Sequence, residues 1–190
     1  WEGKPAAIVM VNDVTNETRR KQQVACHTAA LQKKLQVMRN TVKTSQRFGN
    51  LVGASEAMHR VYERILSAAA CTEPVVIWGE SGTGKELVAR MIHQLSERSA
   101  QQLVPVNCGA IPDGLFEREM FGHQQGAFTG AVQTQPGWYE AAHQGTLFLD
   151  EMGELSKAQQ VKLLRALESG EYTRIGSITP KQADVRLIAA

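Results

Sequence analysis

"VVIWGESGTGKE", residues 75–86, is the segment most informative about the fold. Its first four residues are apolar, as in a strand that is buried on both faces of a parallel sheet. The spacing G-x-x-x-x-G-K follows, and its glycines let the backbone curl so that successive N–H groups point at phosphate oxygens. The next helix offers its N-terminus, and Lys85 can reach the β- and γ-phosphates of a nucleotide. The segment predicts a phosphate-binding loop, and an ordinary glycine-rich turn is the alternative.

The same kind of apolar segment recurs three more times along the chain. "LVPVN" stands at residues 103–107, "GTLFLD" at 145–150 and "DVRLIAA" at 184–190. Helical patterns lie between them, at Lys85–Arg98 and Lys157–Ser169. Strands that alternate with helices are typical of an α/β domain whose parallel sheet is flanked by helices. We therefore expect a doubly wound α/β fold.

A break at "FGN", residues 48–50, marks the start of this domain, which we place at residues 48–190. Ser55 is a suitable N-cap for a helix with apolar residues on one face. The sequence has 190 residues, of which 43% are hydrophobic and 21% charged. This composition suffices for one core of moderate size and a small appendage.

The segment before the break has a different character. Residues 1–16 contain an apolar, β-branched run that ends at Asn-Asp, which predicts a single strand. One strand is not a domain, so we interpret it as the end of a domain that lies upstream. Across residues 17–47, apolar residues recur with the spacing of a coiled-coil seam. A dimerisation helix and an amphipathic helix lying on its own domain both remain open.

Charge, cysteine content and hydropathy argue against several classes of protein. The formal net charge of +2 is too small to indicate a nucleic-acid groove. The three scattered cysteines fit a reducing compartment better than a disulfide framework. No apolar run reaches the roughly 18 residues that a membrane span needs, and no signal peptide opens the chain. We expect a soluble, cytoplasmic protein without membrane contact, whose ends at Trp1 and "VRLIAA" look cut from a longer chain.

Polar residues follow two of the predicted strands. Glu86 stands where the phosphate-loop pattern has a Ser or Thr bound to Mg²⁺, so the metal needs another ligand. Asp150 and Glu151 end the strand at 145–150, the expected layout for one acid that holds Mg²⁺ and another that orients or deprotonates water. Two exposed acids that cap a strand are the alternative. Asn107 also ends a strand, where α/β proteins place ligands, although a turn former fits equally well. Together with the loop, the acids indicate nucleoside-triphosphate hydrolysis.

"HQQGAFTGAVQ", residues 123–133, places one aromatic ring and one hydroxyl, Phe128 and Thr129, among small residues and glutamines. The ring could tuck into a core, or it could form the tip of a mobile loop that meets a partner. His123 and His143 have no metal-ligand spacing with any cysteine. We interpret both histidines as surface or loop residues.

Four ordered motifs together resemble the central AAA+ ATPase domain of the bacterial sigma-54-dependent transcription activators. They are "GESGTGKE", "NCGAIPDGLFEREMFGHQQGAFTGA", "GTLFLDEMGELS" and "ESGEYTRIGS". The resemblance runs from about Leu51 to Ala190, and the hexapeptide "GAFTGA" is highly specific to that family. It implies a P-loop NTPase fold of the AAA+ type that uses ATP and Mg²⁺.

The resemblance also implies the residues of the nucleotide site. Leu51, Val52 and Gly53 match the segment that packs near adenine, and Glu86 is a trait of the family. Asp150 would hold Mg²⁺, Glu151 would act on the water, and Asn107 resembles the asparagine that restrains this glutamate. The Walker A loop would consist of Gly79, Glu80, Ser81, Gly82, Thr83, Gly84, Lys85 and Glu86.

The resemblance assigns the second motif to partner contact. Phe128 and Thr129 would touch sigma-54 while the nucleotide state raises and lowers their loop, and a second loop near residues 176–182 would assist. Glycines suit such a loop because two stable poses need backbone freedom at the hinges. The whole tip would consist of Gly126, Ala127, Phe128, Thr129, Gly130 and Ala131.

The expected function is ATP-driven remodelling of sigma-54 RNA polymerase by a ring of six or seven subunits in the bacterial cytoplasm. The first twenty residues, "WEGKPAAIVMVNDVTNETRR", are similar to the last strand of a PAS sensor domain and its signalling helix. The family's arginine fingers, sensor residue, helical lid and DNA-binding domain would lie downstream, so DNA would be contacted only through a domain absent here. We expect poor hydrolysis by this chain alone. A truncated, non-hydrolysing module that binds nucleotide and partners is the main alternative, and an unrelated AAA+ machine such as a chelatase or clamp loader is another.

Overall fold

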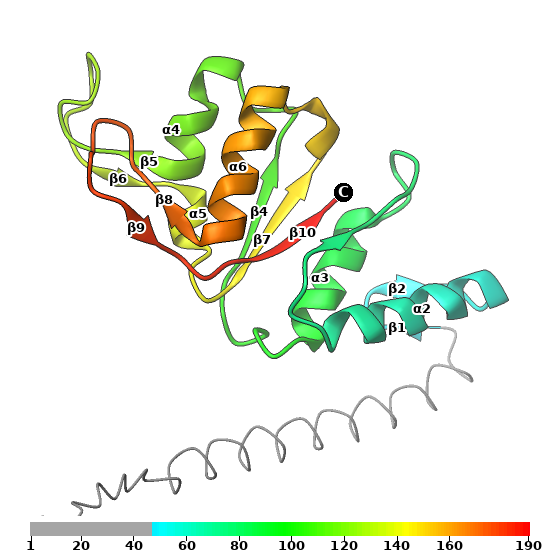
Figure 1. The fold of residues 1–190 in the computed structure, drawn as a ribbon. Helices are drawn as coiled ribbons and strands as arrows, with labels where there is room; N and C mark the ends of the chain where they lie inside the picture. Colours follow the sequence, from blue (N-terminus) through cyan, green and yellow to red (C-terminus); the bar gives the residue numbers. More distant parts are fainter. Residues whose placement is uncertain (1–46) are drawn as a thin grey trace, which may run out of the picture. The chain divides into compact units, whose positions relative to one another are not determined.

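The computed structural model describes residues 47–190 (Figure 1). The expected PAS remnant, residues 1–16, and residues 17–46 of the expected signalling helix lie outside the described residues. Arg47 is described and is not helical, because it belongs to β1 (Arg47–Phe48), which pairs antiparallel with β2 (Leu51–Val52). The predicted break at residues 48–50 is the turn of this hairpin, where Gly49 has a φ of 60°.

The predicted parallel sheet is confirmed. Its four strands are β3 (Val75–Val76), β4 (Leu103–Asn107), β7 (Thr146–Asp150) and β10 (Arg186–Ala189). They lie in the order β3-β10-β7-β4, and every neighbouring pair is parallel. The carboxyl ends of all four strands therefore meet at one edge of the sheet.

Burial along the strands follows their place in the sheet. The central strand β7 is buried from Thr146 to Leu149, as its apolar sequence predicts. The expectation of two buried faces is wrong for β3, where Val76 is 53% exposed. Among the described strands β3 pairs only with β10, so it is an edge strand. Only residues 75–76 of the predicted strand at 75–78 are assigned to it, although the Ile77 N–H still donates to the Ala189 carbonyl over 2.8 Å.

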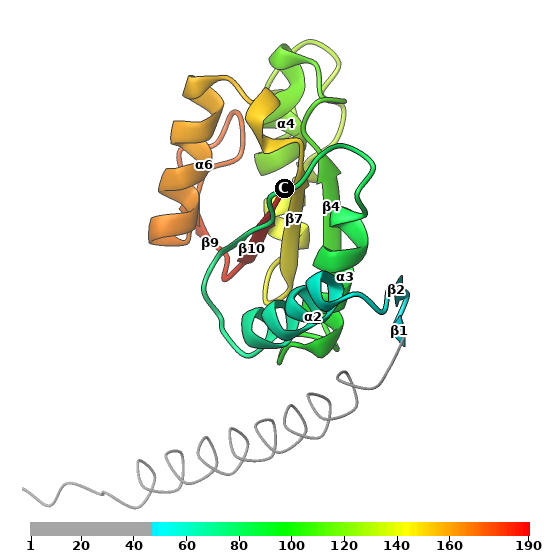
Figure 2. The same ribbon diagram turned by 90° about the vertical axis from the view of Figure 1, so that its right-hand side faces the viewer.

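Helices flank both faces of the sheet (Figures 1 and 2). On one side lie α2 (Glu56–Ala69) and α3 (Lys85–Leu95). On the other lie α4 (Phe116–Phe121), α5 (Trp138–Ala141) and α6 (Lys157–Ser169), with two short 3-10 turns at Asp113–Leu115 and Met152–Glu154. This arrangement places the chain in the α/β class of the prediction.

The helix ends are set by local hydrogen bonds. Ser55 caps α2 as predicted, since its hydroxyl accepts from the Met58 N–H over 3.3 Å. Ser156 and Gln159 form a reciprocal capping box at the start of α6. The predicted α3 is too long, because Ser96 is extended and its hydroxyl donates to the His93 carbonyl and accepts from the Arg98 N–H. The Ser96 hydroxyl thus takes the place of the backbone hydrogen bonds that would continue the helix.

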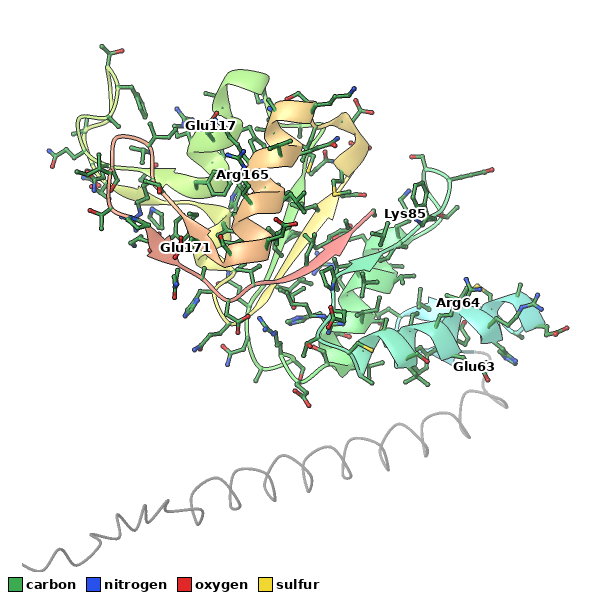
Figure 3. All side chains as sticks on the ribbon, viewed as in Figure 1. Glu63, Arg64, Lys85, Glu117, Arg165 and Glu171 are labelled. Carbon is green, nitrogen blue, oxygen red and sulfur yellow. The ribbon has the colours of Figure 1, made fainter. Side chains whose placement is uncertain are left out.

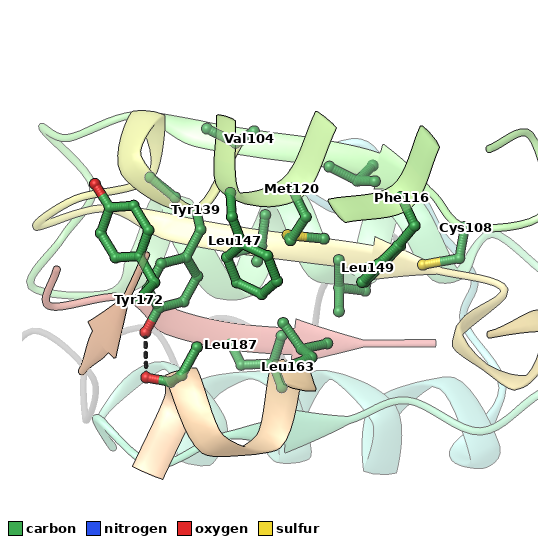
Figure 4. Packing of buried hydrophobic residues seen from close by; sticks show 14 of the residues in the cluster. Val104, Cys108, Phe116, Met120, Tyr139, Leu147, Leu149, Leu163, Tyr172 and Leu187 are labelled. Atoms are coloured by element: carbon green, nitrogen blue, oxygen red, sulfur yellow. Dashed lines mark hydrogen bonds between the residues drawn. The ribbon is translucent and has the colours of Figure 1, made fainter. Parts of the chain in front are cut away.

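The main core lies between the sheet and helices α4 to α6 (Figure 4). The aromatic rings of Phe116, Phe121, Tyr139 and Tyr172 meet there at centroid distances of 5.4 to 6.4 Å. The Tyr139 hydroxyl is buried but donates to the Ala166 carbonyl of α6 over 2.6 Å, so its polar atom is satisfied. Within residues 47–190, no helix combines the length and the apolar character needed to cross a membrane.

Two hairpins project from this body, and the sequence patterns did not indicate either. The first consists of β5 (Gly122–His123) and β6 (Gln135–Pro136), and it lies between α4 and α5. The second consists of β8 (Glu171–Tyr172) and β9 (Lys181–Gln182). Strands of two residues are too short to show a period in the sequence. Figure 1 shows the two hairpins side by side.

Candidate functional site

The loop between β3 and α3 has the backbone shape that its glycines predict. Gly82 and Gly84 have φ values of 78° and 86°, in the left-handed region that favours glycine. Gly79 is needed for space, because a Cβ there would lie 2.9 Å from the Thr83 hydroxyl. The Thr83 hydroxyl in turn donates to the Glu80 carbonyl over 2.7 Å. The loop is therefore a closed turn with no room for side chains on its inner side at Gly79.

Helix α3 begins at Lys85, directly after this turn. The Val88 N–H is the first to bond within the helix, to the Gly84 carbonyl at 3.2 Å, so the N–H groups of residues 85–87 have no partner within the helix. The Lys85 ammonium donates to the carbonyls of Gly79 and Glu80 at 3.1 and 3.0 Å. Figure 3 shows Lys85 beside the loop. Backbone N–H groups and one cation thus converge on the same space, which suits an anion such as a phosphate.

Glu86 points its carboxylate along the helix. Glu86 Oε1 accepts from Nε and Nη2 of Arg90 at 2.9 and 2.6 Å, and both side chains are about half exposed. This i, i+4 ion pair occupies the carboxylate. The geometry agrees with the inference from the sequence that a metal ligand has to come from elsewhere.

An apolar groove of about 410 Å³ adjoins the loop. Met58, Val61 and Ile65 of α2 line it, together with residues 75–79 and the first turns of α3. Of the segment expected near adenine, Leu51 lines the groove, whereas Val52 is 65% exposed and Gly53 instead accepts a hydrogen bond from the Tyr62 hydroxyl. The groove has the size and apolar lining of a small-molecule site.

Asn107, Asp150 and Glu151 meet at the carboxyl edge of the sheet. Asn107 of β4 is in register with Asp150 of β7, and the Cys108 N–H donates to the Asp150 carbonyl over 2.9 Å. A Cβ on Gly109 would lie 2.6 Å from Glu151 Oε2 and 3.4 Å from Asn107 Oδ1. The Glu151 carboxylate and the Asn107 amide therefore both lie against the backbone of Gly109.

Glu151 has an unusual backbone conformation. Its φ of 55° lies in the left-handed region, which costs a residue with a Cβ about 1–2 kcal/mol. Asp150 Oδ1 accepts from the Glu151 N–H over 3.1 Å and so helps to hold the turn. Strain of this kind is typical of active sites, because the surrounding structure fixes a side chain in a direction that the chain alone would avoid.

The two acids also act on their neighbour Cys108. Burial, followed by the negative charges of Asp150 and Glu151, raises the pKa of the Cys108 thiol to about 11. The thiol therefore stays protonated at neutral pH. A protonated, buried thiol is a poor nucleophile, so we interpret Cys108 as a structural residue.

The donor set at this edge fits Mg²⁺. A carboxylate offers several acceptor sites, and Asp150 uses one oxygen for the Glu151 N–H. Among residues 47–190 there is no cluster of three His, Cys, Asp or Glu side chains that could enclose a metal ion. Mg²⁺ does not require such a cluster, because it is usually held by one or two carboxylates, water and the phosphates of the substrate.

Phe128 and Thr129 stand at the tip of the first hairpin, on the loop between His123 and Gln135. Gly126 and Gly130 have φ values of 80° and 100°, and the Ala131 N–H donates to the Phe128 carbonyl over 3.0 Å. The Phe128 ring is 37% exposed, so it does not form part of a core. Its centroid lies 4.9 Å from the His123 ring and 5.8 Å from the Arg118 guanidinium. The loop-tip alternative from the sequence fits this geometry better than the core plug.

The prediction for His123 is wrong. It was expected at the surface or in a loop, but it is a strand residue and 94% of its surface is buried, with Nδ1 lacking a partner among the described groups. His123 pairs in parallel with Ile175 of the second hairpin, and its ring packs against Phe128. His143 is exposed, as expected.

The second hairpin supports the first. Ile175 donates to the Gly122 carbonyl and accepts from the Gln124 N–H, both at 2.9 Å. Gly176 lies so close to Ala127 that a Cβ on it would be 2.7 Å from the Ala127 Cβ. The Gly126–Ala131 tip therefore packs closely against the loop at residues 174–180 through Ala127 and Gly176.

Glu140 of α5 anchors the second hairpin, a role that no pattern in the sequence indicates. Its carboxylate accepts from Arg174 at 2.7 and 2.8 Å, from Lys181 at 2.7 Å and from the Tyr172 hydroxyl at 2.7 Å. Burial by itself would raise the pKa of Glu140, but hydrogen bonds from Lys181, Tyr172 and Arg174 and the Arg174 charge lower it to about 2. The partners lie more than thirty positions away along the chain, so no local pattern could reveal them.

Comparisons with known proteins agree with this geometry. A family model described as the sigma-54 interaction domain matches residues 51–190. A nitric oxide reductase transcription regulator, NorR2, from Cupriavidus necator is 51% identical over 142 residues, which cover 75% of this chain and 27% of that protein. A Nif-specific regulatory protein from Herbaspirillum seropedicae is 41% identical over 184 residues, covering 96% of this chain and 34% of that protein. The chain thus spans about a quarter to a third of the length of these relatives.

Two solved structures are similar to this chain in fold. The structure of NtrX from Brucella abortus in complex with ATP matches with a TM-score of 0.67 at 35% identity, over 81% of this chain and 34% of that one. The structure of the same protein in complex with ADP matches with a TM-score of 0.67 at 32% identity, over 89% of this chain and 35% of that one. The fold is that of a P-loop NTPase domain.

Proposed function

Because the chain belongs to the sigma-54 interaction domain family of AAA+ proteins, we propose that it binds and hydrolyses ATP to remodel sigma-54 RNA polymerase and open promoters. The observation that carries this proposal is that the phosphate loop and the two acids lie at the same edge of the sheet. The phosphate loop follows β3 and the acids Asp150 and Glu151 follow β7, and these strands are parallel. A triphosphate that lies on the loop can therefore extend toward the acids.

Each group of residues has a distinct role in the proposed ATP site. The N–H groups at the start of α3 and the Lys85 ammonium bind and orient the phosphates, while the apolar groove at Leu51 takes the base. Asp150 would hold Mg²⁺, which neutralises charge on the phosphate oxygens. Glu151 orients the attacking water and accepts its proton, and Asn107, which meets Glu151 at Gly109, positions that carboxylate.

The hairpin with Phe128 and Thr129 is the surface that we assign to sigma-54. One stretch of chain joins Asn107 to this hairpin. Asn107 ends β4, the 3-10 turn at Asp113–Leu115 and helix α4 follow, and α4 leads directly into β5. A movement of Asn107 relative to Glu151 can therefore displace the hairpin through this stretch of chain. The whole tip, residues 126–131, would move with its neighbour at residues 174–180, because Ala127 packs against Gly176 and the chain just before the tip bonds to Ile175.

The remaining parts of the proposal concern the assembly and the N-terminal segment. We assign residues 1–16 to the end of a PAS-like sensor domain, 17–47 to a signalling helix and 48–190 to the ATPase domain. A ring of six or seven subunits in the bacterial cytoplasm would complete the site between neighbours. DNA would be bound by a domain outside this chain.

The experiment that tests the proposal compares ATP binding and turnover in the wild-type chain and in Lys85→Ala. Loss of the ammonium removes the fixed counter-charge of the phosphates, so ATP affinity should fall by at least about 100-fold. Unchanged affinity would show that the loop does not bind the phosphates.

A second measurement separates the proposal from a non-hydrolysing binding module. ATP turnover is measured in this chain and in a longer chain from the same protein. Turnover in either supports the ATPase, with faster hydrolysis expected in the longer chain. ATP binding without turnover in both would favour the module.

A further inference from the structure

Trp78 ends the apolar segment before the phosphate loop, and it is 91% exposed. An aromatic side chain of this size usually buries about 150–250 Å², so its exposure is unusual. The phosphate contacts described above come from backbone N–H groups and Lys85, and none of them needs an indole. The ring therefore calls for a separate explanation.

The backbone of Trp78 is fixed, whereas its side chain is free. The preceding residue, Ile77, donates its N–H to the Ala189 carbonyl of β10 over 2.8 Å, and the following residue, Gly79, accepts from Lys85. The Cα of Trp78 is thus held between the sheet and the phosphate loop. With so little of its surface covered, the ring can turn about its two side-chain torsions without displacing a packed neighbour.

The ring also borders the groove of about 410 Å³ that adjoins the loop. Gly79, Thr83 and Lys85 line the same groove at its loop end, and the rest of its lining besides the ring is aliphatic except for Arg64 of α2. Among the described residues that line the groove, Trp78 is the one aromatic side chain. Aliphatic walls can bury a base, but an aromatic face adds stacking, which strengthens binding of a nucleobase by about tenfold.

We propose that Trp78 is a nucleotide-contact residue, whose indole closes over the groove and packs against the nucleoside half of ATP bound at the phosphate loop. The inference rests on the proposed ATP site and adds a specificity residue to it. The indole carries no charge, so it contributes to the base and ribose and leaves the phosphates to the loop. Its position one residue before Gly79 keeps the two contacts at a fixed separation.

The test measures the affinities of ATP and of inorganic tripolyphosphate by calorimetry on the full chain. In Trp78→Ala the dissociation constant for ATP should rise about tenfold, while that for tripolyphosphate should stay within about twofold. Trp78→Phe keeps an aromatic face and should hold ATP affinity within about threefold of the wild type. Val161→Ala removes a half-exposed apolar side chain on α6, away from the groove, and should change neither affinity.

Fluorescence gives an independent readout. ATP should change the tryptophan emission of the wild-type chain, and Trp78→Phe should abolish that change although ATP still binds. The inference is overturned if Trp78→Ala leaves ATP affinity unchanged, since the ring then covers some other surface. It is also overturned if both ligands weaken equally, since Trp78 then acts only through the shape of the loop. A wild-type chain that binds neither ligand would refute the ATP site itself together with this inference.

Discussion

Gly109→Ala tests the arrangement of the proposed catalytic carboxylate with the smallest possible change. Gly109 follows Asn107 and Cys108, and its φ is not in the left-handed region, so an alanine fits the backbone. The added Cβ would lie 2.6 Å from Glu151 Oε2 and 3.4 Å from Asn107 Oδ1. Ordinary contact begins at 3.4 Å, so the Glu151 carboxylate has to move by 3.4 − 2.6 = 0.8 Å, whereas Asn107 can stay in place.

The size of this shift predicts how far ATP turnover should fall. A misplacement of about 1 Å in a reacting group can lower a rate by about 100-fold, so ATP turnover should fall about 10- to 100-fold. ATP affinity should stay within about threefold, because Gly109 is not part of the phosphate loop or the groove. The free energy of unfolding should change by less than about 1 kcal/mol, since the displaced carboxylate is exposed and ends a flexible side chain.

The assay is phosphate release at saturating ATP, with ATP affinity and the melting temperature measured on the same samples. Gly114→Ala is the matched control, because nothing lies within 4 Å of a Cβ at Gly114 and its φ is not left-handed. Turnover at the wild-type rate in a folded Gly109→Ala chain would refute the reasoning, since the position of Glu151 against Gly109 would then be irrelevant to hydrolysis. An equal loss in Gly114→Ala would refute it as well.

Three further predictions concern hydrolysis, stability and partner contact. Glu151→Ala should bind ATP with affinity within about threefold of wild type but lower turnover at least about 100-fold, and full turnover in this variant would remove its catalytic role. The pKa of Glu140 is lowered to about 2 from 4.5, so the ionised carboxylate stabilises the fold above pH 4.5, and this contribution is lost as the pH falls toward 2. Glu140→Gln should therefore lower the free energy of unfolding by about 2–3 kcal/mol at pH 7, with the difference between the two melting curves shrinking below pH 4.5; a difference that is independent of pH would contradict the ion-pair explanation. Phe128→Ala should reduce capture of sigma-54 in a pull-down by at least about tenfold and leave ATP affinity unchanged, and undiminished capture would exclude this ring from the interface.

The elements that the sequence predicted correctly are those whose cause is local. Ser55 caps α2 through a residue three positions away, and α6 spans Lys157–Ser169 as predicted because Ser156 and Gln159 form a capping box across one turn. Strand β7 could be predicted because an unbroken apolar run has few alternatives to a buried strand. The turn between β3 and α3 is local in the same sense, since its glycines and the helix that follows are consecutive.

The incorrect predictions come from contacts that the apolar pattern does not encode, whether the partner is near or far along the chain. The predicted length of α3 was wrong because the Ser96 hydroxyl competes for the backbone, and Arg47 is a strand residue because Val52 is near enough to pair with it. Val76 is exposed although its sequence context is apolar, because burial depends on which strands lie beside β3. Each of these outcomes depends on a neighbour in space that the apolar pattern does not identify.

The chemistry that we propose for this protein can be predicted from the sequence alone, because the glycine-rich loop, the acids at a strand end and the glycine-flanked Phe-Thr pair each stand in one short segment. The tertiary structure decided how these parts meet. It placed β10 between β3 and β7, brought Glu151 and Asn107 together at Gly109, paired His123 with Ile175 and joined Glu140 to the second hairpin. The physical reason is that contacts between segments far apart in the chain are fixed by the packing of the whole sheet and its helices, and only then do single side chains find their partners.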